Sequence, residues 1–197
     1  MSVPPAPPIL LASTSPQRRL ILAQLGIPFD VVPPRYEEHE EPGREPVEVA
    51  KCHARGKARS VAGEAGDRPV LGVDTAVVCD GRIFGKPGGP EQAVEMLEAL
   101  AGKAHEVVSG LCLVTPGWEL TDHAVTRVSF RELTARELGA YIEAGEWEGR
   151  AGAYAIQGVG ASLVERIEGD YLNVVGLPAA LLVAVLAENF PGVYGFG

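Results

Sequence analysis

The chain has 197 residues and a formal net charge of −9 at neutral pH, with 46% hydrophobic and 22% charged residues. This length predicts one domain, and it also allows two small lobes around a cleft. The composition excludes wholesale disorder, and the acidic balance argues against a nonspecific binder of nucleic acid or of anionic membranes.

Strands and helices are predicted to alternate along the chain. Ser15 and Pro16 are typical of a helix start, and Gly26 is typical of a helix stop. Apolar patterning and turn residues predict strands at 9–12, 29–32, 70–79, 82–84, 105–114, 125–133 and 162–167, and helices at 16–25, 46–62, 90–101, 135–144 and 178–189. Thr134 and Glu137 form a capping box. This mixture predicts an α/β fold with a central mixed sheet flanked by helices.

Two loops and one strand stand out in this pattern. Residues 35–46 form a polar, acidic loop, and residues 149–160 form a glycine-rich loop. The strand at 70–79 has the strongest signal in the chain. Because nearly all of its residues are apolar, we expect it to be buried on both faces.

Neither targeting segments nor disulfides are predicted. The longest apolar run, Leu177–Ala187, is shorter than the roughly 18 residues that cross a bilayer. The N-terminus, residues 1–8, lacks the basic start and apolar stretch of a signal peptide. Cys52, Cys79 and Cys112 form no CxxC pair. We therefore expect a cytoplasmic protein without a membrane partner.

A candidate anion site follows the first predicted strand. Ser13 and Ser15 supply hydroxyl groups, and a helix with free N–H groups begins there. Arg18 can bind phosphate oxygens with its planar guanidinium group. An ordinary helix cap beside solvated arginines is the alternative interpretation of the same residues.

Asp74 stands inside the most apolar strand of the chain. A buried aspartate needs a partner, a metal ion or a cleft, because an unpaired buried charge is costly. Clefts at the carboxyl ends of strands are the usual active sites of open α/β sheets. A structural carboxylate at a strand bend, with its hydrogen bonds satisfied, is the alternative.

Four further side chains could carry chemistry. Lys86, between a glycine and a proline, has a defined direction, and Lys57 lies on the second predicted helix. Gln157, among small residues, could bind the donor and acceptor edge of a base. Glu38 in the acidic loop is a candidate metal ligand. The alternatives are solvated surface charges and a glycine-rich connecting loop.

Several short segments occur in a fixed order along nearly the whole chain: residues 11–18 (LASTSPQR), 54–58 (ARGKA), 72–75 (GVDT), 85–87 (GKP), 97–102 (LEALAG), 105–110 (HEVVSG), 151–158 (AGAYAIQG) and 173–178 (NVVGLP). This ordered set resembles the Maf family of nucleoside triphosphate pyrophosphatases. The resemblance implies hydrolysis of a nucleoside triphosphate to the monophosphate and pyrophosphate. It also implies a divalent cation, Mg²⁺ or Mn²⁺, as cofactor, and one domain over residues 1–197 in which two α/β lobes flank the active-site cleft, with a homodimer as a candidate assembly.

The resemblance also implies roles for individual residues. Asp74 matches the catalytic carboxylate, and Glu38 matches a carboxylate near the metal, so that these two are the expected metal ligands. The implied substrate-binding residues are Ser13, Ser15, Gln17, Arg18, Lys57, Thr75, Lys86 and Gln157. Among these, Thr75 and Gln157 match specificity positions of the branch that acts on dTTP and UTP. We therefore expect Asp74 to activate water beside the metal while nearby cations neutralise the triphosphate.

Two residues depart from the family pattern. Gln17 stands where the dTTP/UTP branch commonly has Arg, and Arg150 stands where the family usually has Lys. Gln17 leaves open a pyrophosphatase for another or a modified nucleotide. Two other functions also remain open: a nucleotide-binding regulator of cell division or septum formation with weak hydrolysis, and an enzyme that acts on phosphate esters.

Overall fold

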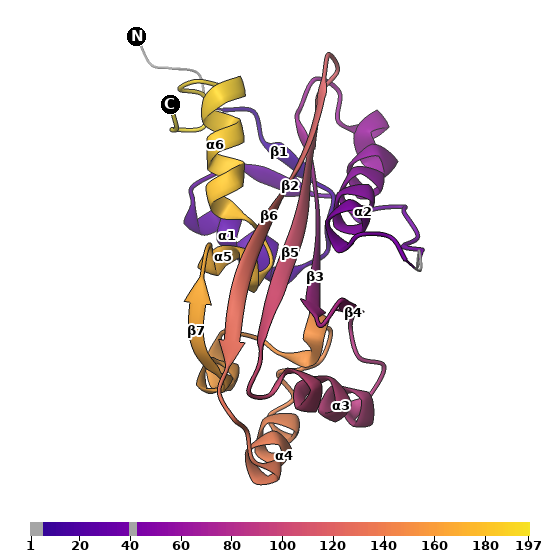
Figure 1. The fold of residues 1–197 in the computed structure, drawn as a ribbon. Coiled ribbons are helices and arrows are strands. Elements are labelled where there is room, and N and C mark those ends of the chain that lie inside the picture. The colour runs from indigo at the N-terminus through magenta and orange to yellow at the C-terminus, as the bar shows by residue number, and fades with distance from the viewer. Residues whose placement is uncertain (1–5, 40–42) are drawn as a thin grey trace. The chain divides into compact units, whose positions relative to one another are not determined.

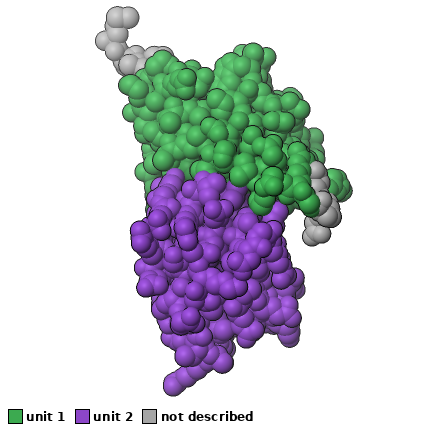
Figure 2. Space-filling model, viewed as in Figure 1, with its two compact units in different colours: residues 1–74, 109–124, 176–197 green, residues 75–108, 125–175 purple. Residues whose placement is uncertain are grey.

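The computed structural model describes residues 6–39 and 43–197, so that residues 40–42 of the predicted acidic loop and residues 1–5 lie outside it. The chain divides into two compact units, which Figure 2 shows in different colours. Unit 1 comprises Met1–Asp74, Ser109–Ala124 and Gly176–Gly197, and unit 2 comprises Thr75–Val108 and Val125–Val175. The chain passes between the units at four places, one of which lies between Asp74 and Thr75, two neighbouring residues of one strand.

The described residues contain a seven-stranded mixed sheet with the order β2-β1-β3-β5-β6-β7, in which β4 pairs with β3 (Figure 1). The strands are β1 (Ile9–Leu11), β2 (Phe29–Val31), β3 (Val70–Cys79), β4 (Arg82–Phe84), β5 (Ala104–Val114), β6 (Glu119–Phe130) and β7 (Val164–Glu168). Strand β1 is parallel to β2 and β3, whereas β4 and β7 are antiparallel to β3 and β6. The predicted α/β class with a mixed sheet is confirmed.

The helices flank the sheet. They are α1 (Pro16–Gln24), α2 (Pro46–Val61), α3 (Pro90–Leu100), α4 (Ala135–Glu143), α5 (Tyr171–Val175) and α6 (Ala179–Asn189), with short 3₁₀ helices η1 (Ala62–Glu64), η2 (Ala151–Ala153) and η3 (Gly158–Leu163). Within residues 6–39 and 43–197, none of the helices has both the length and the apolar character needed to cross a membrane.

The local signals at the helix ends are confirmed. Ser15 has extended backbone angles, and its hydroxyl accepts a hydrogen bond from the Arg18 N–H at the start of α1. Thr134 and Glu137 form both hydrogen bonds of a capping box before α4. Gly26 has a φ of +69°, as a glycine after a helix often does.

Three elements differ from the sequence prediction. Strand β6 begins at Glu119 rather than at residue 125. Residues 119–124 are mostly polar and show no apolar alternation, so that the sequence gives no strand signal there, and pairing with β5 makes them a strand. Helix α5 was not predicted, since its five residues are too few for a helical period. The predicted glycine-rich loop contains η2 and the start of η3, which also takes the first two residues of the predicted strand 162–167.

The core of unit 1 brings α2 close to the sheet. Small residues of α2, Ala54 and Ala58, pack with Leu10 and Val70 of the strands. Gly72 on β3 lies against the α2 backbone so closely that an added Cβ would overlap the Ala54 carbonyl oxygen. The missing side chain therefore allows the helix and the strand to approach at backbone distance.

The core of unit 2 contains α3, α4 and parts of β3, β5 and β6. At its centre, the rings of His105, Phe130 and Tyr154 pack edge to face, with centroid distances of 4.8–5.4 Å. The side chain of His105 is buried, and its Nε2 atom lies 2.9 Å from the Tyr154 hydroxyl. The Tyr154 hydroxyl thus satisfies one ring nitrogen of His105 inside the core, whereas the buried Nδ1 atom of His105 has no hydrogen-bond partner among the described residues.

Candidate functional site

In unit 1, one lysine lies between two carboxylates. The Lys57 Nζ atom is 2.5 Å from Asp74 Oδ1 and 2.6 Å from Glu38 Oε1. The side chains of Lys57 and Asp74 are only 10% and 11% exposed, whereas that of Glu38 is 55% exposed. Asp74 is therefore a buried, ion-paired carboxylate, and Glu38 brings a second negative charge from the solvent side.

Helix α2 places Lys57 beside Asp74. The close contact of α2 with Gly72 brings the helix backbone to β3 only two residues before Asp74. The ammonium group at the end of a long, flexible side chain then reaches the carboxylate directly. The missing Cβ of Gly72 thus helps to bring these opposite charges together.

The segment that carries Glu38 is attached to the same helix. The Tyr36 hydroxyl lies 3.0 Å from His53 Nδ1, and the Tyr36 ring lies on Gly56, where an added Cβ would overlap it. One residue earlier, the Arg35 N–H donates a hydrogen bond of 3.0 Å to Ser60 Oγ. These contacts hold the chain before Glu38 along α2, so that its carboxylate can meet Lys57.

A second group of polar side chains in unit 1 surrounds the start of α1. Arg18 is buried and donates from Nη1 to Ser13 Oγ at 3.1 Å and from Nε to the Gly176 carbonyl oxygen at 2.9 Å. Ser13 Oγ also accepts a bond from the Ser15 N–H at 3.2 Å, and the Ser15 hydroxyl donates to Gln17 Oε1 at 3.4 Å. All four residues predicted here are thus connected by hydrogen bonds.

The two groups of unit 1 also interact electrostatically. Burial lowers the pKa of the Arg18 guanidinium from its ordinary value, while the charges of Asp74 and Glu38 act in the opposite direction. The two cations Arg18 and Lys57 therefore share their surroundings with two carboxylates. A helix N-terminus beside these cations is suited to oxygen atoms of an anionic ligand.

The three predicted residues of unit 2 lie on separate segments. Thr75 is half-buried on β3, directly after Asp74, whereas Lys86 and Gln157 are exposed. The Gly152 N–H donates a 3.0 Å hydrogen bond to the Gly85 carbonyl oxygen, which joins the backbone next to Lys86 to the glycine-rich loop that contains Gln157.

The two carboxylates of unit 1 fit a divalent cation. Within residues 6–39 and 43–197, no group of three or more His, Cys, Asp or Glu side chains is placed to hold a metal ion. Mg²⁺, however, is usually held by one or two carboxylates together with water and the phosphates of the substrate. Glu38 and Asp74 already direct oxygen atoms at one cation, the Lys57 ammonium.

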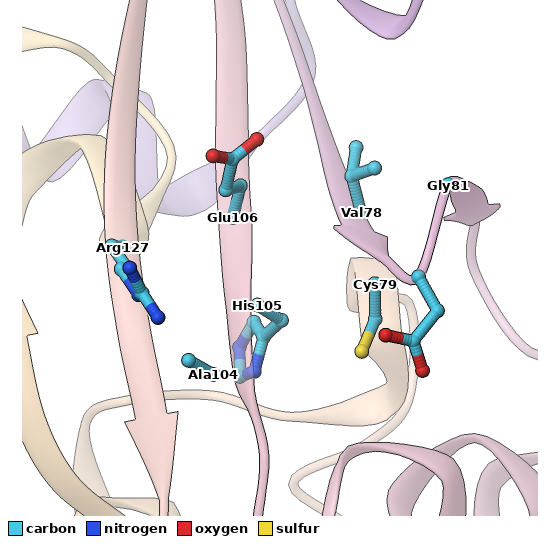
Figure 3. A pocket seen from close by; sticks show the side chains of 8 residues that line it. Val78, Cys79, Gly81, Ala104, His105, Glu106 and Arg127 are labelled. Atoms are coloured by element: carbon cyan, nitrogen blue, oxygen red, sulfur yellow. The ribbon is translucent and has the colours of Figure 1, made fainter.

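A pocket of about 300 Å³ in unit 2 lies elsewhere (Figure 3). Its lining residues are Val78, Cys79, Asp80, Gly81, Ala104, His105, Glu106 and Arg127. None of them is a residue that the sequence predicted for the site. The charged side chains of the lining have both signs, because Asp80 and Glu106 are acidic and Arg127 is basic, so that the pocket has no uniformly basic lining for a triphosphate.

The sequence model of the family described as "Maf-like protein" matches residues 8–189. The chain belongs to this family. A Maf-like relative from Moorella thermoacetica is 47% identical over 95% of this chain and 97% of its own length. Relatives from Gloeobacter violaceus (46% identical, 91% of this chain and 95% of its own) and Pyrococcus furiosus (41%, 90% and 93%) align similarly. All three are named dTTP/UTP pyrophosphatase.

The membership confirms the family that the ordered motifs indicated, while the roles of the individual residues stay predictions. Some contacts of the Maf-like site could not be found in the sequence. Gly176 contributes a backbone oxygen to Arg18 across 158 residues of chain, and every residue has such an oxygen. Tyr36 lies in a polar loop with no periodic pattern, so that its contact with Gly56 leaves no sequence signal.

Proposed function

We propose that this Maf-like protein hydrolyses the bond between the α- and β-phosphates of a pyrimidine nucleoside triphosphate, dTTP or UTP. The products are the nucleoside monophosphate and pyrophosphate. The observation that carries the proposal is the buried Asp74 carboxylate, paired with Lys57 and flanked by Glu38, in a chain whose relatives are named dTTP/UTP pyrophosphatase.

The chemistry requires a base and several positive charges. One water molecule loses a proton and attacks the α-phosphorus, the P–O bond to the β-phosphate breaks, and pyrophosphate leaves with the bonding electrons. About four negative charges on the triphosphate oppose the attack, so that catalysis depends on neutralising them locally. On a chain of net charge −9, Arg18 and Lys57 must supply this neutralisation within unit 1.

Asp74 is the base in this proposal. Its carboxylate accepts the proton of the attacking water, while Lys57 next to it orients the carboxylate and binds phosphate oxygen. Arg18, held by Ser13 and by the Gly176 carbonyl, binds a phosphate with a guanidinium group whose direction is already set. Lys86, Thr75 and Gln157 of unit 2 contribute phosphate and base contacts, with Gln17 completing the set.

A divalent cation, Mg²⁺ or Mn²⁺, is part of the proposal. Glu38 and Asp74 would hold it, and when bound it withdraws charge from phosphate oxygens and acidifies water. Both carboxylates bind Lys57 in the structure, so that a divalent cation held by them would share their oxygen atoms with the ammonium group.

The test is release of pyrophosphate from dTTP, UTP, CTP, ITP and methylated GTP, with Mg²⁺, Mn²⁺ or chelator. We expect pyrophosphate from dTTP or UTP, lost with chelator, and a decrease in kcat of about 100-fold or more in Asp74→Asn. Asp67→Asn, an exposed aspartate before the same strand, is the matched control with wild-type kcat.

The outcomes separate the candidate functions. Wild-type turnover by Asp74→Asn at saturating metal would refute the role of Asp74. A preference for another triphosphate would support the pyrophosphatase activity but not the pyrimidine specificity, and it would attribute the different specificity to Gln17. Tight nucleotide binding without pyrophosphate from any substrate would instead favour a regulatory protein.

A further inference from the structure

The backbone that follows Gln157 is held by a carboxylate from another part of unit 2. Glu146 accepts two hydrogen bonds of 2.9 Å, one at each carboxylate oxygen, from the N–H groups of Val159 and Gly160. Hydrogen bonds to a charged acceptor are roughly twice as strong as neutral ones. Glu146 thus takes the place of a helix cap for η3, because Gln157 makes no side-chain cap bond there.

The conformation of this segment depends on its glycines. Gly158 has a φ of +68°, which favours glycine, and an added Cβ would overlap the Glu146 carboxylate. Gly160 also has no room for a Cβ, which would overlap the Ala155 carbonyl oxygen. The turn after Gln157 is therefore packed directly on Glu146 and on its own preceding backbone.

A second contact fixes the other side of Gln157. The Ala155 N–H donates a 3.0 Å hydrogen bond to the hydroxyl of Tyr141, which is buried in the core of unit 2. Gln157 itself is exposed and lies between this contact and the two bonds to Glu146. A side chain that recognises a base through hydrogen bonds needs such a fixed backbone. A mobile backbone would lose entropy when the nucleotide binds, and it would weaken the discrimination between different bases.

We propose that Glu146 is a positioning residue for recognition of the nucleobase: it fixes the backbone at 158–160 so that the Gln157 amide meets the base in one orientation. The inference rests on the proposed function and extends it to a residue that does not touch the substrate. The ligand class is a pyrimidine base, whose carbonyl and N–H groups match the acceptor and donor of an amide.

The experiment compares Glu146→Ala, Glu146→Gln and the control Glu148→Gln, an exposed glutamate two residues further along. The alanine leaves two N–H groups without their acceptor, whereas glutamine retains one acceptor oxygen but turns an NH₂ group toward an N–H. The first readout is amide hydrogen exchange of Val159 and Gly160. The second is kcat and KM for UTP and for CTP, which differ only at one edge of the base.

In Glu146→Ala we expect exchange at both amides to be about tenfold faster and the ratio of kcat/KM for UTP over CTP to fall about tenfold, mainly through KM. Glu146→Gln should lie between, and Glu148→Gln should match the wild type. Unchanged exchange would overturn the proposal, and so would equal losses of kcat with both nucleotides at an unchanged ratio, which indicate a merely structural role.

Failure of the proposed function gives a different result. If the wild type releases no pyrophosphate from any triphosphate, both the proposed function and the role of Glu146 in recognition of the nucleobase are refuted. The exchange measurement still reports whether Glu146 holds the segment. If pyrophosphate is released normally and the UTP/CTP ratio survives in Glu146→Ala, only the role of Glu146 is refuted.

Discussion

Lys57 carries one positive charge but lies within hydrogen-bonding distance of two carboxylates, those of Asp74 and Glu38. Removing one partner of a buried ion pair is costly, because the remaining charge keeps its desolvation penalty without its partner. An exposed pair contributes little, since water and salt screen it. Lys57 should therefore differ sharply from Lys51, the other lysine of the same helix.

We expect Lys57→Met to lower the free energy of unfolding by about 3 kcal/mol, because it leaves the buried Asp74 carboxylate unpaired. The value of kcat/KM should also fall at least about tenfold, since a positive charge that the phosphates need is lost. Urea unfolding and pyrophosphate release measure the two effects.

Lys51 provides the matched control on the same helix. Its ammonium lies 3.0 Å from Glu48, three residues away, in an exposed pair. Such pairs contribute about 0.3 kcal/mol, so that Lys51→Met should retain nearly full stability and full activity. Similar losses in both variants would contradict a special role for the buried pair.

The distance between helix α2 and the sheet depends on residues without side chains. Gly72 leaves the space that the Ala54 carbonyl and the Ala58 side chain occupy, and the helix presents a stripe of alanines to the strand. On β5, Gly110 makes the same kind of contact, because an added Cβ would overlap the Ala50 carbonyl. Two glycines on neighbouring strands thus set the distance between helix and sheet.

We expect Gly72→Ala to destabilise the protein by about 3 kcal/mol, because the new methyl group meets backbone that cannot move without displacing α2. Activity should fall further than stability alone explains, since a displaced α2 withdraws Lys57 from Asp74. Thermal unfolding and kcat at a temperature where the variant is folded separate the two effects.

Gly63 offers the comparison for Gly72. Nothing lies within 4 Å of a Cβ added there, and the backbone is in an ordinary conformation. Gly63→Ala should therefore be neutral or stabilising by up to about 1 kcal/mol, through a less flexible unfolded chain. If Gly72→Ala were as well tolerated, the backbone contact would not limit the approach of the helix.

The whole molecule should become less stable in moderately acidic solution because of His105. Burial lowers the pKa of this histidine from 6.5 to about 4, and its neighbours are the uncharged rings of Phe130 and Tyr154. Between these pH values His105 is protonated in the unfolded chain and neutral in the folded protein. The contribution of His105 to the free energy of unfolding is therefore complete above about pH 6.5 and is lost as the pH falls to about 4.

This loss should reach about 3 kcal/mol of the free energy of unfolding for the wild type. In His105→Gln, the slope of that free energy between pH 6.5 and 4 should be smaller, because the titrating group is gone. Urea unfolding across this range measures the slope. His123→Gln, at an exposed histidine, is the control and should follow the wild-type curve; an equal slope in His105→Gln would rule out His105 as the source.

Local sequence signals determined most of the fold and the family. Apolar periods, the caps at Ser15 and Thr134 and the long apolar run of β3 act between near neighbours, so that they can be recognised without knowledge of the fold. The start of β6 could not be predicted, because its polar residues become a strand only by pairing with β5. The ordered motifs identified the family from many short segments together.

Only the tertiary structure decided how the candidate site residues are held. The sequence indicated Lys57, Asp74 and Glu38 separately, but the lysine between two carboxylates depends on how closely α2 packs on β3. The contacts of Arg18 with the Gly176 carbonyl and of Glu146 with two N–H groups use backbone atoms as partners. Because the backbone carbonyl is common to every residue and its N–H to all but proline, such partners leave no trace in the order of side chains, and long-range folding alone selects them.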